Sequence, residues 1–487
     1  MVDDIRLSPE VELALVNAYL NLEDIAIEDS LVVVDPDKAI RLKYRDDSLF
    51  SFYPIDFVDI PNQDTIDFKL FPLLPGADIE VSLGTIADIE LFEAVFDKGL
   101  LHFMLSAAAP YLTDVDVEVI LKNATNNGSP VAYTVTLPAG QVSVSESFPI
   151  EGLTFDCTNN GQDVNYIGFS AQVLDGDSVS PNTQGLNLGI TFTDLKIRNT
   201  TGYFGARSIN IPDGDFDFDI SAFSDFNDGF LLTNPTISLL ISNEVGIDLA
   251  FNSDFDGVNN DGVLTALNAN SQSVTGPMVL GNEVSSVLTF NKSNSDIVDF
   301  IGAMPNKIFY SGDVSLNDGQ TRTENFIDKE SQVVVGIDVD LPLELQIESL
   351  RMVEEIDNID FITENPDEID EVELIFYTEN GFPIDLNVQV SLLDDVTGDS
   401  INGFDLKVLT AAPVNPNTGR VTQWVHSKES IVFTDLLIDD LSRASTIRLK
   451  AKLSTVNGGS QFVKLYTDYG VNIKIAAKAK LNLKLED

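Results

Sequence analysis

Hydrophobic and polar residues alternate with a period of two along most of this chain. The segments 114–121 (DVDVEVIL), 284–290 (VSSVLTF), 446–453 (TIRLKAKL) and 470–485 (GVNIKIAAKAKLNLKL) are examples, and glycine or proline interrupts the chain between such segments. This alternation, together with abundant Val, Ile, Thr and Phe, predicts half-buried β-strands. Helical periodicity is nearly absent: residues 8–25 leave a choice between helix and strand, and residues 80–96 leave room for a short helical turn. The pattern therefore predicts an all-β protein.

The strand pattern occurs three times. Segments 101–121, 235–255 and 372–393 each contain an apolar strand, a short break, an aspartate flanked by apolar residues and a second strand. The aspartates are Asp116, Asp248 and Asp385. Further strands follow in the same order after each segment. We therefore expect three tandem β-sandwich domains, at residues 95–205, 206–352 and 353–487, and an N-terminal segment, 1–94, that packs on the first sandwich and contains a hairpin over 31–45.

The second and third copies carry the break most clearly, in 233–251 (TNPTISLLISNEVGIDLAF) and 377–388 (YTENGFPIDLNV), and Gly312 lies in a late strand of the second copy. This order of elements resembles the LEA-2 (water-stress/hypersensitive-response) family, a fibronectin-III-like β-sandwich. The first copy departs from the family pattern because 106–117 lacks the asparagine. The asparagine and glycine of the break are expected to adopt positive φ. Tandem domains of this kind also resemble parts of lipid-handling proteins, which implies lipid carriage as an alternative function.

Segments 7–25 and 199–220 resemble stretches of cell-surface lipoproteins of Bacteroidota. That resemblance implies an exported protein of the outer membrane, cell surface or periplasm, with a lipidated cysteine upstream of residue 1. Cys157 is internal and cannot be that anchor. The first residues lack the basic and apolar regions of a signal peptide, and no run of about 20 apolar residues predicts a transmembrane span.

Asp and Glu outnumber Lys and Arg by 78 to 28, for a formal charge of −50. Such a field repels nucleic-acid phosphates and predicts no nucleic-acid partner. One cysteine excludes an intramolecular disulfide and a Cys-based zinc site, and a Ser-His-Asp triad would have to use His102 or His426. None of the common catalytic motifs is present. We therefore expect a protein that is not an enzyme.

Residues 254–263 (DFDGVNNDGV) resemble the start of a calcium loop, with Asp254, Asp256 and Asp261 as candidate ligands. The bidentate Glu of an EF-hand is missing, because Thr265 stands at that position. Asn, Asp and Gly also favour tight turns, so a turn without metal is the preferred interpretation, with calcium as the only candidate cofactor. The strand 213–219 places four aspartates on one face, either as a solvated surface or as a cation-binding strip.

The C-terminal region is basic. From Arg443 to Asp487 there are nine Lys or Arg and three acids. This region either complements the acidic surface of the same chain or docks an acidic partner or lipid phosphates. The sequence as a whole predicts an exported, non-enzymatic structural or protein-interaction module of a cell envelope. Alternatives are a lipid carrier, an Asp/Glu-dependent polysaccharide-active enzyme and a calcium-dependent adhesin.

Overall fold

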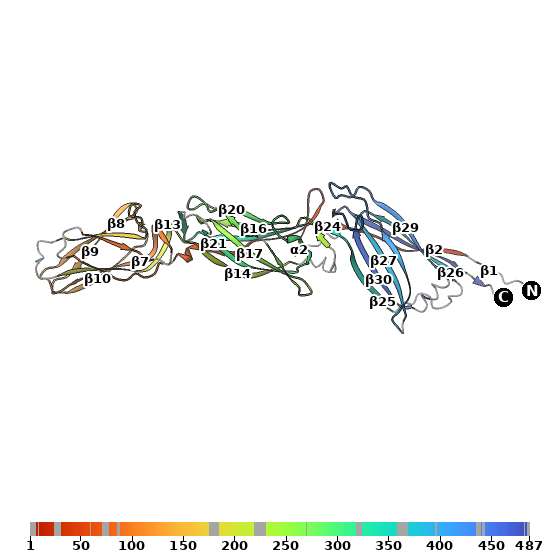
Figure 1. Ribbon diagram of the computed structural model, residues 1–487, viewed down its shortest axis with the longest axis horizontal. Helices are drawn as coiled ribbons and strands as arrows, with labels where there is room; N and C mark the ends of the chain where they lie inside the picture. Colours follow the sequence, from red (N-terminus) through yellow and green to blue (C-terminus); the bar gives the residue numbers. More distant parts are fainter. Residues whose placement is uncertain are drawn as a thin grey trace, which may run out of the picture.

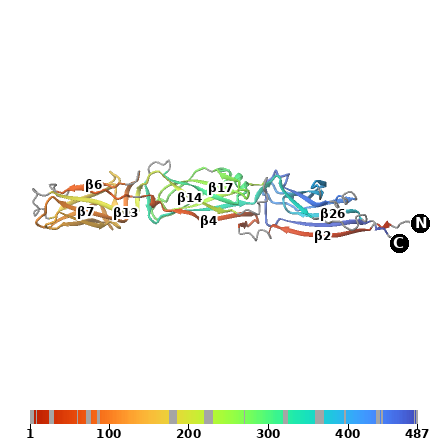
Figure 2. The same cartoon turned by 90° about the horizontal axis from the view of Figure 1, so that it is seen from below.

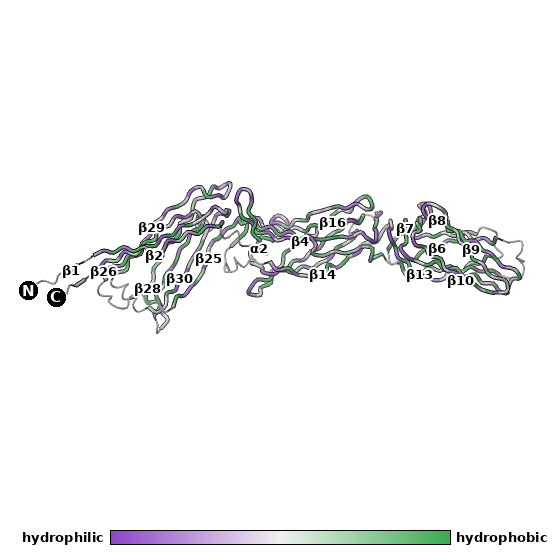
Figure 3. The backbone as a smooth tube through the Cα atoms, turned by 180° about the vertical axis from the view of Figure 1, so that it is seen from behind, coloured by the Kyte–Doolittle hydropathy of each residue, from purple (hydrophilic) through white to green (hydrophobic). Residues whose placement is uncertain are grey.

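The computed structural model describes residues 6–7, 9–23, 31–58, 60–70, 77–84, 88–174, 185–218, 230–268, 270–317, 324–357, 369–394, 397–434, 440, 444–481 and 483–484. The protein is a rod, and the first and last described strands, β1 (Arg6–Leu7) and β33 (Leu483–Lys484), pair with each other at one end of it (Figure 1). Nearly all regular structure is β-strand, which confirms the all-β prediction. Hydrophobic and hydrophilic positions alternate along the strands of all three parts of the rod (Figure 3).

The sheets form three groups along the rod, which we call the distal, central and basal sandwiches. Each group has seven strands that follow one another in the same order. The distal strands are β6 (Ala77–Ser82), β7 (Glu90–Ala107), β8 (Val115–Asn126), β9 (Ser129–Leu137), β10 (Ser143–Pro149), β12 (Tyr166–Val173) and β13 (Leu186–Tyr203). The central strands are β14 (Arg207–Asp217), β16 (Thr236–Asn243), β17 (Leu249–Val258), β18 (Leu264–Leu267), β20 (Val284–Phe290), β21 (Lys307–Leu316) and β23 (Val333–Pro342). The basal strands are β25 (Leu350–Asp357), β26 (Ile369–Asn380), β27 (Ile384–Asp394), β28 (Ser400–Leu409), β29 (Val425–Thr434), β30 (Ala444–Thr455) and β32 (Gly470–Leu481).

The strand pairing is the same in all three groups, and every pair is antiparallel. One sheet has the order β10-β7-β13 in the distal, β20-β16-β23 in the central and β29-β26-β32 in the basal sandwich. The other has the orders β9-β8-β12-β6, β18-β17-β21-β14 and β28-β27-β30-β25. In the distal group, β11 (Thr154–Asp156) pairs with both β7 and β8 and so joins the two sheets. The repeated order of strands seen in the sequence thus corresponds to a repeated pattern of hydrogen bonding.

The N-terminal segment does not pack only on the first sandwich, as the sequence had suggested. It pairs with the last strand of each sandwich in reverse order: β2 (Glu10–Asn21) pairs with β32, β4 (Ile40–Phe52) with β23 and β5 (Ile66–Lys69) with β13. β2 and β4 follow each other along one side of the rod (Figure 2). β6 is the first strand of the distal repeat, so that repeat begins before residue 95.

Three local predictions have mixed outcomes. The ambiguous residues 8–25 contain the strand β2, which pairs with β32 along its whole length. The predicted hairpin is confirmed, since β3 (Val32–Val34) pairs with β4. The short helix α2 (Ile297–Gly302) was not predicted, because six residues are too few for a helical period to appear.

In two copies, a buried asparagine stabilises the turn at the break between the second and third strands. Asn243 and Asn380 are both fully buried, and each side chain accepts a hydrogen bond from the backbone N–H two residues later and donates one to the carbonyl four residues later. Neither residue has a positive φ, so the expectation of left-handed geometry was wrong. The amide acts instead as an internal template for the turn.

An aspartate after each break also has an equivalent role. Asp248 accepts from the N–H of Gly276 and Asp385 from the N–H of Ala411. The matching bond in the distal sandwich is made by Asp114, which accepts from the N–H of Ala139, and not by Asp116. Asp116 accepts from the Thr136 hydroxyl instead. The repeat pattern in the sequence had therefore matched Asp116 to Asp248 and Asp385, whereas the equivalent residue is Asp114, two positions earlier.

The junctions between sandwiches are packed and hydrogen-bonded. At the distal junction, β22 (Asn325–Asp328) pairs with the end of β13, and Lys329 Nζ lies 2.7 Å from an Asp97 carboxylate oxygen. At the basal junction, β24 (Glu344–Ile347) pairs with both β15 (Phe230–Leu232) and β31 (Val463–Lys464). One cluster of buried apolar side chains runs from the distal sandwich to Tyr466 and Tyr469 at the basal junction. Large apolar junctions restrict domain motion, so we expect the rod to be stiff.

Candidate functional site

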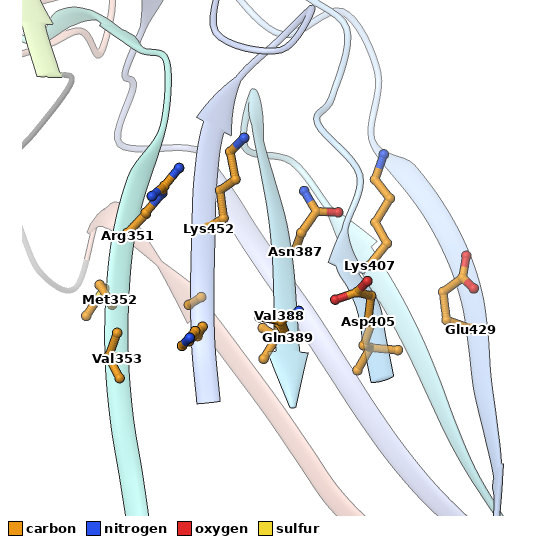
Figure 4. Close-up of a pocket in the computed structure, with 13 residues that line it drawn as sticks. Arg351, Met352, Val353, Asn387, Val388, Gln389, Asp405, Lys407, Glu429 and Lys452 are labelled. Carbon is orange, nitrogen blue, oxygen red and sulfur yellow. The ribbon is translucent and has the colours of Figure 1, made fainter. Parts of the chain in front are cut away.

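A cavity of about 760 Å³ lies against the basal sheet of β25, β30, β27 and β28 (Figure 4). The strand register arranges its lining in two rows that cross the four strands. The first row is Arg351, Lys452, Asn387 and Lys407, and the second is Val353, Lys450, Gln389 and Asp405. Glu429 of β29 lies at the β28 end. We call this set of residues the basal trough.

The side chains of both rows project away from the interior of the sandwich. The ring of Phe404 on β28 packs against Phe433 of the opposite sheet, with 5.8 Å between centroids. Successive side chains of a strand point to opposite faces, so Asp405 and Lys407 share the outer face, and register extends that face to the other three strands. All eight residues of the two rows are exposed. The trough is therefore open to solvent.

The charges of the trough are separated into two sides. Arg351, Lys450 and Lys452 have no ion pair among the described residues, although acids outnumber bases almost threefold in the chain. Lys407 is 3.0 Å from Asp385, and the remaining acids, Asp405 and Glu429, lie toward β28 and β29. Cations thus line the β25–β30 side, carboxylates line the β28–β29 side, and the amides of Asn387 and Gln389 lie between them.

Lys478 of β32, by contrast, is neutralised within the chain. Lys478 lies opposite Glu12 on one neighbouring strand and Glu373 on the other, and its Nζ is 2.8 Å from a Glu10 carboxylate oxygen. This contact lowers the pKa of Glu10 and raises that of Lys478. The basic C-terminal region therefore divides: Lys478 is complemented within the chain, whereas Lys450 and Lys452 of β30 have no ion pair among the described residues. Arg351 and Lys407 lie outside the basic region, and only the strand register could have identified them.

Lys452→Glu should increase stability. Arg351 and Lys452 stand directly opposite each other, and like charges in that position destabilise a sheet, whereas an Arg–Glu pair stabilises it. We expect the free energy of unfolding in urea to rise by about 0.5 kcal/mol. Lys478→Glu is the matched control and should lower it, because Lys478 lies between glutamates. A fall in stability for Lys452→Glu would mean that an unrecognised acid already pairs with Lys452.

The three calcium candidates do not form a common site. Asp254 and Asp256 lie within β17, opposite Ser311 and Phe309 of β21, and Asp261 lies in the following turn. In that turn the Asn259 side chain accepts from the N–H groups of Asp261 and Val263, and Gly262 has a φ of 76°. No group of three His, Cys, Asp or Glu side chains able to hold a metal occurs in the described part of the chain.

Calcium and magnesium should therefore raise the melting temperature equally at matched ionic strength, by screening the net charge. A specific site at a hundredfold excess over its Kd would add about 2.7 kcal/mol with calcium alone. Thermal melts of the wild type and of Asp254→Asn/Asp256→Asn check this. A rise with calcium only, lost in the variant, would establish a metal site here.

The acidic strand 213–217 is a solvated face. Phe216 and Phe218 are buried, as the alternation predicted, while Asp213, Asp215 and Asp217 are exposed. Asp215 is 2.6 Å from Lys307 Nζ on β21. Asp219 lies outside the described residues.

The two histidines occupy strand surfaces. His102 lies between hydroxyls, with Nδ1 2.6 Å from Ser147 Oγ and Nε2 2.8 Å from Thr193 Oγ1. A threonine stands where a triad needs a carboxylate, so the ring lacks the group that would stabilise its protonated form. His426 is 3.5 Å from Glu379 and exposed. Cys157 is fully buried, and burial raises the pKa of its thiol to about 12, which makes it a poor nucleophile.

Comparisons with known proteins give only distant similarities. No protein-family model and no curated protein matches the chain. Among solved structures, a protein described as secreted, from Parabacteroides distasonis, is 16% identical over 58% of this chain and 89% of its own, with a TM-score of 0.34. A triple-jelly-roll turret protein of an archaeal virus (12%, 96% of both chains) and a protein of infectious bursal disease virus (8%, 93% and 81%) have TM-scores of 0.12 and 0.13. These scores are too low to carry an argument about fold or function.

None of the helices in the described residues is long and apolar enough to cross a membrane.

Proposed function

We propose that this protein is an exported, non-enzymatic spacer of a cell envelope, which holds the distal sandwich away from the end where β1 and β33 lie. One observation carries the proposal. The chain runs out along the rod through β2, β4 and β5 and returns through the three repeats, so its first and last described strands, β1 and β33, meet at the basal end. An attachment at either terminus leaves the loops beyond β7 and β9 at the far end of a stiff rod.

The chemistry of the molecule supports a role in contact rather than turnover. His102 lies between two hydroxyls and not beside a carboxylate, His426 beside Glu379 is exposed, and the basal trough offers charged and amide groups without a buried nucleophile or base. The acidic surface suits an extracellular setting. The resemblance to LEA-2 domains and to Bacteroidota lipoproteins points in the same direction.

A variant without the distal sandwich tests the proposal. Arg207 Nη1 donates to the Phe57 carbonyl at 3.3 Å, so the two chain crossings at the distal junction are close. Residues 59–204 can therefore be replaced by a short Gly-Ser linker. On intact producing cells, we expect a membrane-impermeant reagent to label the full chain and this variant equally. Only the full chain should form cross-links with a neighbouring envelope component, or protect that component from the reagent.

Small-angle scattering provides the physical control. A compact chain of 487 residues would have a radius of gyration of about 23 Å, and the rod should exceed that value clearly. The shortened variant should lose length without losing its melting transition. Full chain found only in the cytoplasm, or a compact scattering curve, would contradict the spacer function.

A second function, lipid carriage, has one observation in its favour. Leu13 of β2 and Met352 and Ile356 of β25 belong to the inner faces of the basal sandwich by register, yet all three are exposed. The basal sheets thus leave apolar surface uncovered along the side of β2 and β25. Mass spectrometry of an organic extract of the purified protein tests this function, and a stoichiometric acyl lipid would support it.

A further inference from the structure

β2 is the most exposed apolar strand of the described chain. It forms the outer edge of the basal sheet, where it pairs with β32 on one side only (Figure 2). Long, apolar edge strands present unpaired N–H and C=O groups and are normally protected by lysine, proline or a covering loop. β2 contains neither lysine nor proline. Its exposed large apolar side chains are Val11 (39%), Leu13 (59%), Leu15 (54%), Tyr19 (62%) and Leu20 (51%).

A bulge in β2 changes which residues of its second half point to the apolar face of the strand. The register with β32 shifts between Ala14 and Val16. Before the shift, Val11 and Leu13 oppose Ala479 and Ala477, and after it Ala18 and Leu20 oppose Ile473 and Val471. Val11, Leu13, Ala18 and Leu20 therefore share one face, and Glu10, Glu12, Asn17 and Tyr19 share the other.

This arrangement is self-complementary about the centre of the strand. In an antiparallel pair of two β2 strands centred between residues 15 and 16, Val11 opposes Leu20 and Leu13 opposes Ala18 on the apolar face. On the polar face, Glu12 opposes Tyr19 and Glu10 opposes Asn21. Both glutamates lie in the first half of the strand, so no glutamate faces another. A parallel pair would instead place glutamate opposite glutamate, which is unfavourable.

We propose that a second copy of this chain covers β2, through antiparallel β2–β2 pairing around a twofold axis. The basal sheet then continues into the partner's basal sheet, and the pairing satisfies the edge hydrogen bonds and buries the apolar side chains of both copies. Because β2 runs from the terminal end of the rod toward the central sandwich, the two rods point in opposite directions. The dimer is a bipolar rod with a distal sandwich at each end.

The net charge of −50 on each copy sets the conditions for this pairing. Repulsion between the copies weakens as ionic strength rises from about 0.15 to 1 M and the Debye length falls from about 8 to 3 Å. Sedimentation velocity on the full chain should therefore show a doubled mass that increases with protein concentration and with salt. Scattering should show a longer particle, as opposed to a thicker one of unchanged length.

Substitutions on the exposed strand test the surface. Leu13→Lys/Leu15→Lys should be monomeric under all these conditions, with an unchanged melting curve. The matched control is Leu264→Lys/Met278→Lys, which adds the same charge at exposed apolar residues of the central sandwich and should still dimerise. A wild type that stays monomeric at high salt would overturn the proposal, as would an equal dimer in the β2 variant or a monomer that carries lipid on this surface.

Cysteine cross-linking tests the register even if the lysine variant folds poorly. Ala14 and Asn17 oppose each other across the proposed axis, so Ala14→Cys/Asn17→Cys should form a disulfide-linked dimer on mild oxidation. Glu12→Cys/Asn17→Cys is the control, because those positions are diagonal neighbours about 7–8 Å apart, beyond the reach of a disulfide. Cys157 is buried and does not interfere. Equal cross-linking of both pairs, or none, would overturn the register.

Discussion

Asn380→Ala should destabilise the basal sandwich by about 3 kcal/mol. The Asn380 side chain is fully buried and makes four hydrogen bonds to the backbone. Its Nδ2 donates to the carbonyls of Phe382 and Ile384 at 3.1 Å and of Thr410 at 2.8 Å, and its Oδ1 accepts from the Phe382 N–H at 2.9 Å. Alanine removes these four bonds in a site that water does not reach. The Phe382 carbonyl keeps the Ala412 N–H as a donor, but each buried group that is left unpaired costs about 1–3 kcal/mol.

The measurement is urea unfolding followed by a probe in the basal sandwich, the fluorescence of Trp424. Asn387→Ala, at an exposed position of the neighbouring strand, is the control and should change the free energy of unfolding by less than about 0.5 kcal/mol. Asn243→Ala should produce a similar loss in the central sandwich, because its amide makes equivalent bonds. Equal stability of Asn380→Ala and Asn387→Ala would show that the turn does not depend on the amide.

Gly312→Ala should destabilise the central sandwich by more than about 3 kcal/mol, through strain and a backbone clash. Gly312 has a φ of 134°, and a Cβ there would lie 2.0 Å from the carbonyl oxygen of Asn252. That oxygen belongs to the adjacent strand β17, so β17 and β21 would have to separate. Only glycine lets the two backbones approach this closely.

Gly128→Ala separates the two causes. Gly128 has a φ of 81°, and a Cβ there would meet nothing within 4 Å, so its substitution adds conformational strain alone. That strain costs about 1–2 kcal/mol, and the excess at Gly312 measures the clash. Thermal melts of both variants give the comparison. A loss at Gly312 no larger than at Gly128 would mean that the two strands adjust without cost.

The order of strands could be predicted from the sequence because each strand carries its own period-two pattern. The partner of a strand could not, because alternation defines the two faces and not the neighbour. β2, β4 and β5 lie within 60 residues of one another, yet they belong to three different sandwiches. A segment that crosses from one sandwich to the next has no signal that distinguishes it from a segment that stays.

The basal trough was beyond the reach of the sequence for a related reason. The sequence showed an excess of lysine and arginine after residue 443, but it did not distinguish cations that are neutralised by neighbouring acids from cations that are not. Lys478 lies among glutamates from β2 and β26, whereas Lys450 and Lys452 lie beside Arg351, almost 100 residues earlier in the chain. Only the register across four strands distinguishes a neutralised cation from an unpaired one.

The out-and-back path of the chain imposes an order on its biosynthesis. β2 is synthesised before the strands of all three repeats, but its partner β32 is synthesised after the other strands of those repeats. The distal sandwich can close much earlier, and once folded it holds β4 beside the returning chain, which shortens the loop that the central sandwich must close. Folding then proceeds in order from the distal sandwich through the central one to the basal one. Unfolding should follow the opposite order, so a force that separates the two ends of the chain should detach the basal strands first and unfold the distal sandwich last.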